Sequence, residues 1–114
     1  MIMEKLCPRF EKAMGLISTR WVGLILFDLL KGTKRFSEME ADLPISGRLL
    51  SDRLKMLEKE GIVKRNIYSE FPVRIEYSLS DKGNELEPVI KAIQFWADEH
   101  IPPEETDDTD EQRV

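Results

Sequence analysis

The 114-residue sequence is poor in the features that mark secreted and membrane proteins. Its single cysteine, Cys7, cannot form a disulfide within the chain, so we expect a reducing compartment such as the cytoplasm. No apolar run reaches the roughly 18 residues of a membrane span, and the most apolar stretch, residues 21–30, is interrupted by Asp28. The first residues also lack the basic and apolar pattern of a secretory signal. We therefore expect a cytoplasmic protein without a membrane partner.

Residues suited to catalysis or metal binding are equally scarce. His100 is the only histidine, and one histidine with one cysteine cannot supply the four ligands of a structural zinc site. The sequence shows no set of nucleophile, base and orienting residue, and no glycine-rich phosphate loop. We therefore expect no catalytic residues, no metal site, no cofactor and no enzyme activity.

Charge is distributed unevenly along the chain, whose formal net charge is −5. Residues 102–114 contain six acids and one arginine, whereas residues 48–74 contain seven bases and four acids. Acid-rich segments with few apolar residues do not bury enough surface to fold. We predict one folded domain over residues 1–101 and a disordered acidic tail over residues 102–114.

Hydrophobic periodicity predicts helices over 10–17, 20–30, 36–43 and 46–60, with 20–30 apolar on nearly every side and so buried. In the last of these, Leu50, Leu54 and Leu57 form an apolar stripe, Ser46 is the N-cap, and the opposite side carries mostly charged residues. Arg53 lies within the apolar arc, and we expect it to pair with Asp28 because a buried guanidinium needs a partner.

Alternating patterns predict strands over 63–68 and 73–79, followed by a long helix after Ser80 in which Pro88 marks a kink or the true start. A lone hairpin is unstable and must pack on helices. The order of elements predicts an α+β fold, mostly α: a winged helix-turn-helix with a two-strand β-wing. The terminal helices are more apolar than so small a body can cover, which indicates a homodimer. We expect its interface to include Phe10, Met14, Ile17, Val89, Ile93 and Trp96.

Four segments carry a resemblance to a known family: "CPRFEKAMGLISTRW", "ILFDLLKGTKRFSEME", "ISGRLLSDRLKMLEKEGIVKR" and "FPVRIEYSLSDKGNELEPVIKAIQFW". From Cys7 to His100 the chain resembles the HxlR-type winged helix-turn-helix transcriptional regulators. The resemblance implies a dimer that binds double-stranded DNA and represses or activates nearby operons. Thr19, Gly47 and Asp52 depart from the residues common in the family. Asp52 repels phosphate but can accept a hydrogen bond from cytosine N4, so it affects the expected target sequence.

A major groove accepts one α-helix, and we expect helix 46–60 to be the recognition helix. The residues expected at base edges and phosphates are Lys34, Arg35, Ser46, Gly47, Arg48, Ser51, Asp52, Lys55, Arg65 and Arg74. The hairpin tip at Ser69–Glu70 is a candidate for the minor groove, although the charge of Glu70 argues against it. Two alternatives remain open: a winged-helix protein–protein module that never touches DNA, and a MarR-like or PadR-like ligand-responsive regulator. The sequence identifies no small-molecule effector.

Cys7 is a candidate redox sensor, because Lys5 and Arg9 flank it and positive neighbours favour the reactive thiolate. In the resembled family, a cysteine at this place serves some members as a sensor of oxidants or electrophiles. The alternative is a small apolar residue packed near a dimer seam.

Overall fold

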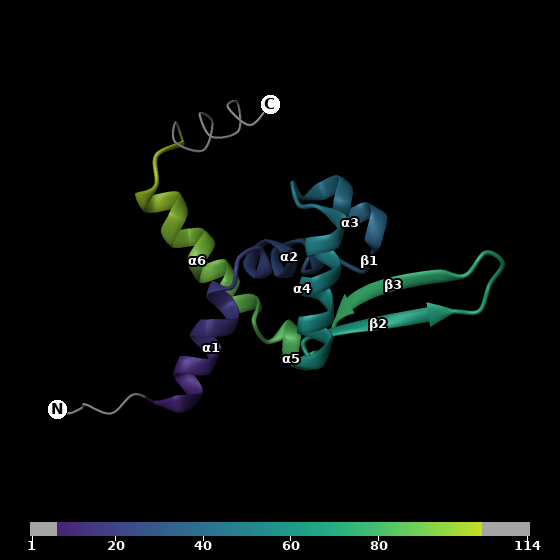
Figure 1. The fold of residues 1–114 in the computed structure, drawn as a ribbon. Helices are drawn as coiled ribbons and strands as arrows, with labels where there is room; N and C mark the ends of the chain where they lie inside the picture. The colour runs from purple at the N-terminus through teal and green to yellow at the C-terminus, as the bar shows by residue number, and fades with distance from the viewer. Residues whose placement is uncertain (1–6, 104–114) are drawn as a thin grey trace.

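The computed structural model describes residues 7–103 (Figure 1). Within this range lie six helices and three strands: α1 Pro8–Ser18, α2 Val22–Leu29, β1 Lys34–Arg35, α3 Phe36–Asp42, α4 Gly47–Lys59, β2 Val63–Tyr68, β3 Arg74–Leu79, α5 Asp81–Asn84 and α6 Glu87–His100. The predicted order of helices and hairpin is confirmed. The predicted acidic tail, 102–114, lies almost entirely outside the described residues and stays a prediction.

The core forms where α2 and α4 pack on the sheet. The predicted stripe of Leu50, Leu54 and Leu57 is fully buried, as the helical period requires. Helix α2 is only partly as expected, because Leu24 is 50% exposed and Phe27 is also exposed. None of the described elements covers that face of α2, so the prediction of a helix buried on every side is wrong there.

Helix α2 also begins two residues later than predicted, at Val22. The residue before it, Trp21, has a φ of 79°, in the left-handed region that residues with a side chain rarely adopt. This backbone conformation ends the turn after α1 and prevents the helix from starting at Arg20. The cause is the local geometry of the turn, which hydrophobic periodicity does not report.

The sheet has three strands rather than the two of the predicted wing. Strand β3 is central, and β1 and β2 both pair with it in antiparallel fashion. Lys34 lies opposite Tyr77 and Arg35 opposite Glu76, so the two residues form a short strand directly before α3. Strands β2 and β3 project away from the body, while α1 and α6 lie on the opposite side (Figure 1).

The predicted long C-terminal helix is divided into α5 and α6. Ser80 caps α5 by accepting a hydrogen bond from the Gly83 amide at 3.0 Å, and Pro88 lies in the first turn of α6. Gly83 is buried against the residue just before β2, and a Cβ at this position would clash with the Ile62 carbonyl oxygen. Only glycine allows α5 to approach β2 this closely. Pro88 therefore marks the true start of the last helix, one of the two outcomes predicted for it.

Candidate nucleic-acid interface

Helix α4 is fixed at its first residue. The Ser46 hydroxyl accepts a hydrogen bond from the Leu49 amide at 3.2 Å, which confirms the predicted cap. Gly47 lies directly against α3, since a Cβ at this position would meet the Glu40 carboxylate at 2.5 Å. The cap fixes the start of α4, and Arg48 is exposed in its first turn.

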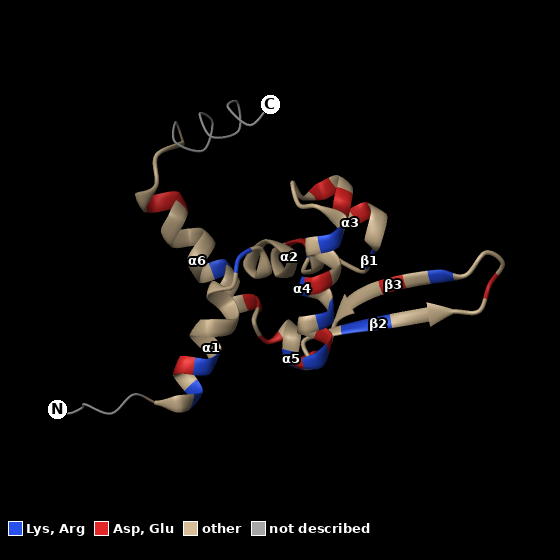
Figure 2. Cartoon of the chain, in the orientation of Figure 1, with Lys and Arg blue, Asp and Glu red and all other residues tan. Residues whose placement is uncertain are grey.

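The outer face of α4 is charged and exposed. Arg48, Asp52, Lys55 and Lys59 are exposed, Ser51 is half-buried, and residues 47–59 contain four bases and two acids. Figure 2 shows Lys and Arg along α4 and again on both wing strands, with a few acids between them. The predicted recognition residues of α4 therefore lie together on the solvent side of a helix whose other side is buried.

Arg53 is tied to the turn before α2. Its Nε donates a hydrogen bond to the Arg20 carbonyl oxygen at 2.8 Å. The predicted pairing with Asp28 is therefore wrong, because a backbone carbonyl satisfies the guanidinium instead. This contact links the middle of α4 to the connection between α1 and α2.

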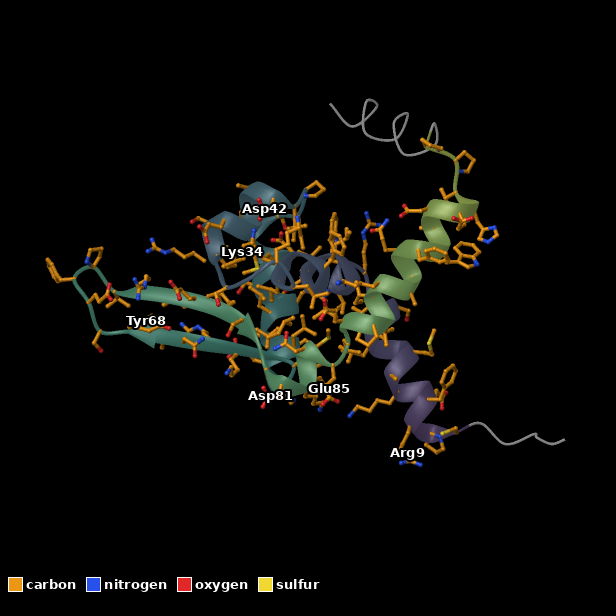
Figure 3. All side chains as sticks on the ribbon, turned by 180° about the vertical axis from the view of Figure 1, so that it is seen from behind. Arg9, Lys34, Asp42, Tyr68, Asp81 and Glu85 are labelled. Carbon is orange, nitrogen blue, oxygen red and sulfur yellow. The ribbon has the colours of Figure 1, made fainter. Side chains whose placement is uncertain are left out.

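Asp28 pairs with Lys31 and with Lys34, a residue predicted to contact DNA. Asp28 is 2% exposed, and the Lys34 ammonium lies 3.5 Å from its carboxylate and 2.8 Å from that of Asp42 (Figure 3). Burial raises the pKa of Asp28, whereas the hydrogen bond from Lys34 lowers the pKa of Asp42. Lys34 thus joins α2, β1 and α3, and two carboxylates already engage its charge.

On the wing, Arg74 is engaged in a similar way. Its guanidinium lies 4.3 Å from the centre of the Tyr68 ring, and its Nη2 lies 3.2 Å from the Glu70 carboxylate. Its Nε lies 3.2 Å from the Glu76 carboxylate, an ion pair without the alignment of a hydrogen bond. Arg65, by contrast, is exposed and forms no ion pair within residues 7–103.

Arg35 and Lys64 are two further bases of the sheet. Arg35 is exposed on β1, opposite Glu76 of the central strand. Lys64 is a further exposed base on β2 that the sequence pattern did not single out as a site residue. Its position directly before Arg65, in a strand that follows a basic helix, was the available signal. Lys64 and Arg65 therefore lie near the end of α4, whereas Arg35 lies on the opposite edge of the sheet.

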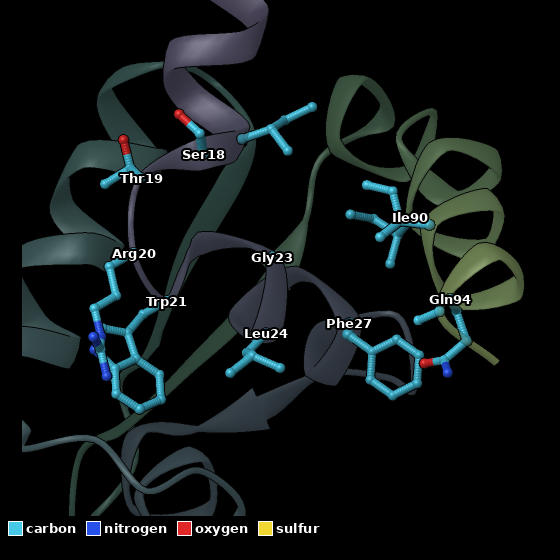
Figure 4. A pocket seen from close by; sticks show the side chains of 12 residues that line it. Ser18, Thr19, Arg20, Trp21, Gly23, Leu24, Phe27, Ile90 and Gln94 are labelled. Atoms are coloured by element: carbon cyan, nitrogen blue, oxygen red, sulfur yellow. The ribbon is translucent and has the colours of Figure 1, made fainter. Parts of the chain in front are cut away.

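The side of the molecule formed by α1 and α6 is exposed and apolar. A groove of about 480 Å³ lies between α2 and α6, lined by Leu24, Phe27 and Ile90 among others (Figure 4). Ile17 and Ile93, two of the residues predicted at a dimer interface, also line it. The other predicted interface residues are exposed: Phe10, Met14, Val89 and Trp96.

Cys7 lies at the N-terminus of α1 and is exposed. Its carbonyl oxygen accepts the first hydrogen bond of the helix, from the Glu11 amide at 2.9 Å, and Pro8 follows it. Arg9 is exposed beside it, while Lys5 lies outside the described residues. The thiol is therefore open to solvent at the free end of α1.

The family is decided by comparison with known proteins. The model of the HxlR-like helix-turn-helix family matches residues 16–105. The chain belongs to this family. The HTH-type transcriptional regulator YvaP of Bacillus subtilis is 59% identical over 104 residues, which are 90% of this chain and 96% of YvaP. YodB of the same organism, also an HTH-type transcriptional regulator, is 42% identical over 102 residues, 89% of this chain and 91% of YodB.

Solved structures of similar regulators share the winged-helix fold. The reduced form of YodB superposes with a TM-score of 0.77 at 42% identity, covering 87% of this chain and 98% of YodB. The oxidised form of the redox regulator HypR gives 0.78 at 34% identity, covering 84% of this chain and 99% of HypR. YvaP and YodB are transcriptional regulators, and HypR is a redox regulator. In the part described here, 7–103, no helix combines the length and apolarity that a membrane crossing requires.

Proposed function

We propose that the protein is a sequence-specific transcriptional regulator that binds double-stranded DNA as a homodimer and has neither enzyme activity nor a cofactor. The observation that carries the proposal is the outer face of α4, where Arg48 and Lys55 are exposed over a stripe of buried leucines. Such a helix fits a major groove without any rearrangement of the core. This role places the protein with the DNA, which we expect to be in the cytoplasm.

The recognition residues of the proposal are Ser46, Gly47, Arg48, Ser51, Asp52 and Lys55. Arg35, Lys64 and Arg65 are the exposed bases next to them that would meet phosphates. Lys34 and Arg74 act differently in the proposal: their ion pairs hold the helix-turn-helix and the wing in shape.

A winged-helix module that binds only proteins is the alternative from a different class. Such a module needs no run of bases joining α4 to the wing. Lys55 and Lys59 on α4 and Lys64 and Arg65 at the start of β2 are all exposed, although neighbouring strand residues point to opposite faces of the sheet. Exposed bases on both the helix and the wing favour a polyanion over a protein partner.

The proposal can be tested by selecting bound duplexes from a random pool with the purified protein. A twofold dimer places two recognition helices in successive major grooves, about 34–36 Å apart. The selected sites should be inverted repeats whose centres are separated by one or two helical turns. Single, non-repeated sites would contradict the dimer, and a pool without enrichment would contradict sequence-specific binding.

A second proposed property is regulation through Cys7. The exposed thiol at the start of α1 supports it, since exposed thiolates are the ones that oxidise. Among the solved relatives, YodB is described in diamide-treated and quinone-bound forms and HypR in reduced and oxidised forms. Oxidation of Cys7 would act on α1 and, through it, on the relative positions of the two recognition helices.

A further inference from the structure

The tip of the wing presents an aromatic side chain to solvent. Phe71 lies between β2 and β3 and is 103% exposed, the highest value among the large hydrophobic residues of 7–103. Val73, also exposed, extends this apolar tip. Scattered exposed apolar residues are common on protein surfaces. Phe71 differs from them in the support beneath it and in its position.

The support is the cluster around Arg74. The guanidinium stacks 4.3 Å from the Tyr68 ring and pairs with Glu70 and Glu76 at 3.2 Å each. Tyr68 and Arg74 are also the last cross-strand pair of the hairpin. These ion pairs hold the polar groups near the tip together, and Phe71 extends beyond them. One guanidinium faces two carboxylates, so the cluster keeps one net negative charge, which the contact of Phe71 with a minor groove has to outweigh.

The position suits a groove next to the recognition site. Strands β2 and β3 have six residues each, which at about 3.3 Å per residue gives a reach of roughly 20 Å. The hairpin carries its tip well clear of the body (Figure 1). On one side of a duplex, the adjacent minor groove lies about half a helical turn, or roughly 17 Å, from the centre of a major groove. The length of the wing matches this separation.

Charge along the hairpin fits the same placement. Residues 63–76 contain three bases and two acids, and both acids are paired with Arg74. The exposed bases, Lys64 and Arg65, lie at the end of β2 next to α4, where the phosphates between the two grooves would pass. The wing thus offers positive charge near its base and an apolar ring at its tip.

We propose that Phe71 enters the minor groove beside the site read by α4 and wedges between two stacked base pairs. Apolar side chains inserted in this way unstack one base step and bend the duplex toward the major groove. The inference rests on the proposed DNA binding. In a homodimer the two wings would place one wedge on each flank of the inverted repeat. Flexible pyrimidine–purine steps should be preferred at the wedge, because they kink most easily.

The test uses the selected duplex with 2-aminopurine placed in turn at each flanking step, and a second copy labelled at both ends for energy transfer. Wild-type protein should raise 2-aminopurine fluorescence at one step on each flank and shorten the end-to-end distance. Phe71→Ala should abolish both signals and weaken binding on the order of tenfold, since the stacking contact is lost. Phe71→Trp should keep the bend, and stacking should quench its fluorescence.

Lys91→Ala is the control, because Lys91 is exposed on α6, remote from the wing, and forms an ion pair with Glu87 on its own helix. It should bind and bend DNA as wild type does, and all variants should melt at the wild-type temperature. Unchanged bending and fluorescence with Phe71→Ala, while Lys55→Ala weakens binding, would overturn the wedge and leave the proposed function standing. Loss of self-association in Phe71→Ala, with DNA binding unchanged, would assign the tip to a protein contact and also overturn the wedge. Failure of the wild type to bind any duplex would overturn both proposals.

Discussion

Two exposed faces of this protein differ in what lies behind them and in what they present. Helix α4 buries three leucines in the core and presents charge to solvent. Helix α1 buries no residue, and α6 buries only Ile90, yet both present large apolar side chains. Charged side chains are stable in water, whereas apolar faces gain free energy when another surface covers them. The first face therefore suits a polyanion, and the second suits an apolar partner such as a second copy.

The largest effect on stability is expected on the buried side of α4. Leu54 is 1% exposed, and Leu54→Ala should reduce the free energy of unfolding by about 3 kcal/mol, because it leaves a cavity under the helix. Denaturant titration measures this loss. Lys55→Ala, one position on and exposed, should leave stability nearly unchanged. Equal effects of the two substitutions would show that α4 does not pack as described.

The apolar face should respond to a single charge. Ile93 is 51% exposed on α6, and Ile93→Glu should weaken self-association at least about tenfold, since a carboxylate at an apolar contact loses its hydration. Sedimentation velocity would detect the shift to monomer. Lys91→Ala, on the same helix, removes only a solvated ion pair with Glu87 and should leave the dimer intact. A wild-type protein that sediments as a monomer would refute the dimer.

Oxidation of Cys7 tests whether a change at α1, on the apolar face, alters the DNA affinity of α4. Mild peroxide or diamide should change wild-type DNA affinity several-fold and should leave Cys7→Ser unaffected. A bond between the Cys7 residues of two copies requires their Cα atoms within about 7 Å, and mass spectrometry without reductant distinguishes it from a mixed disulfide with a small thiol. Modified Cys7 with unaltered DNA affinity would leave it as a packing residue.

The smallest effect on stability is expected from the ion pairs among Asp28, Lys34 and Asp42. The hydrogen bond from Lys34 lowers the pKa of Asp42 below its ordinary value of 3.8. Ionised Asp42 therefore adds stability above that pH, and the contribution is lost as pH falls through the lowered pKa. Asp42→Asn should melt slightly below wild type at pH 7, and the two curves should converge in acid. A difference that grows toward low pH would contradict the pairing.

Local patterns were sufficient to predict much of this fold. A period of 3.6 residues identified the buried leucines of α4, and a period of two identified the hairpin. The two-residue strand β1 was missed because it exists only through pairing with β3, far along the chain. The left-handed backbone of Trp21 was missed as well, since no pattern of side chains encodes it.

For the candidate site, the sequence predicted which side chains are exposed but not which of them have partners. Periodicity placed Arg48 and Lys55 on the exposed side of α4, but it did not reveal which bases already have partners. Lys34 is engaged by Asp28 and Asp42, which lie on other elements. Arg53 bonds a backbone carbonyl 33 positions earlier in the chain. Such partners depend on tertiary contacts, so exposed and engaged bases look alike in the sequence.

The central claim, that the outer face of α4 binds DNA, is tested most directly by the salt dependence of binding. Affinity for the selected duplex should be measured by fluorescence anisotropy over a series of salt concentrations for wild type, Lys55→Ala and Lys91→Ala. Each phosphate contact adds about one counterion to the slope of log affinity against log salt. Lys55→Ala should bind more weakly with a slope lower by about one, and Lys91→Ala should match wild type. Wild-type affinity and slope in Lys55→Ala, or an equal loss in Lys91→Ala, would contradict the claim.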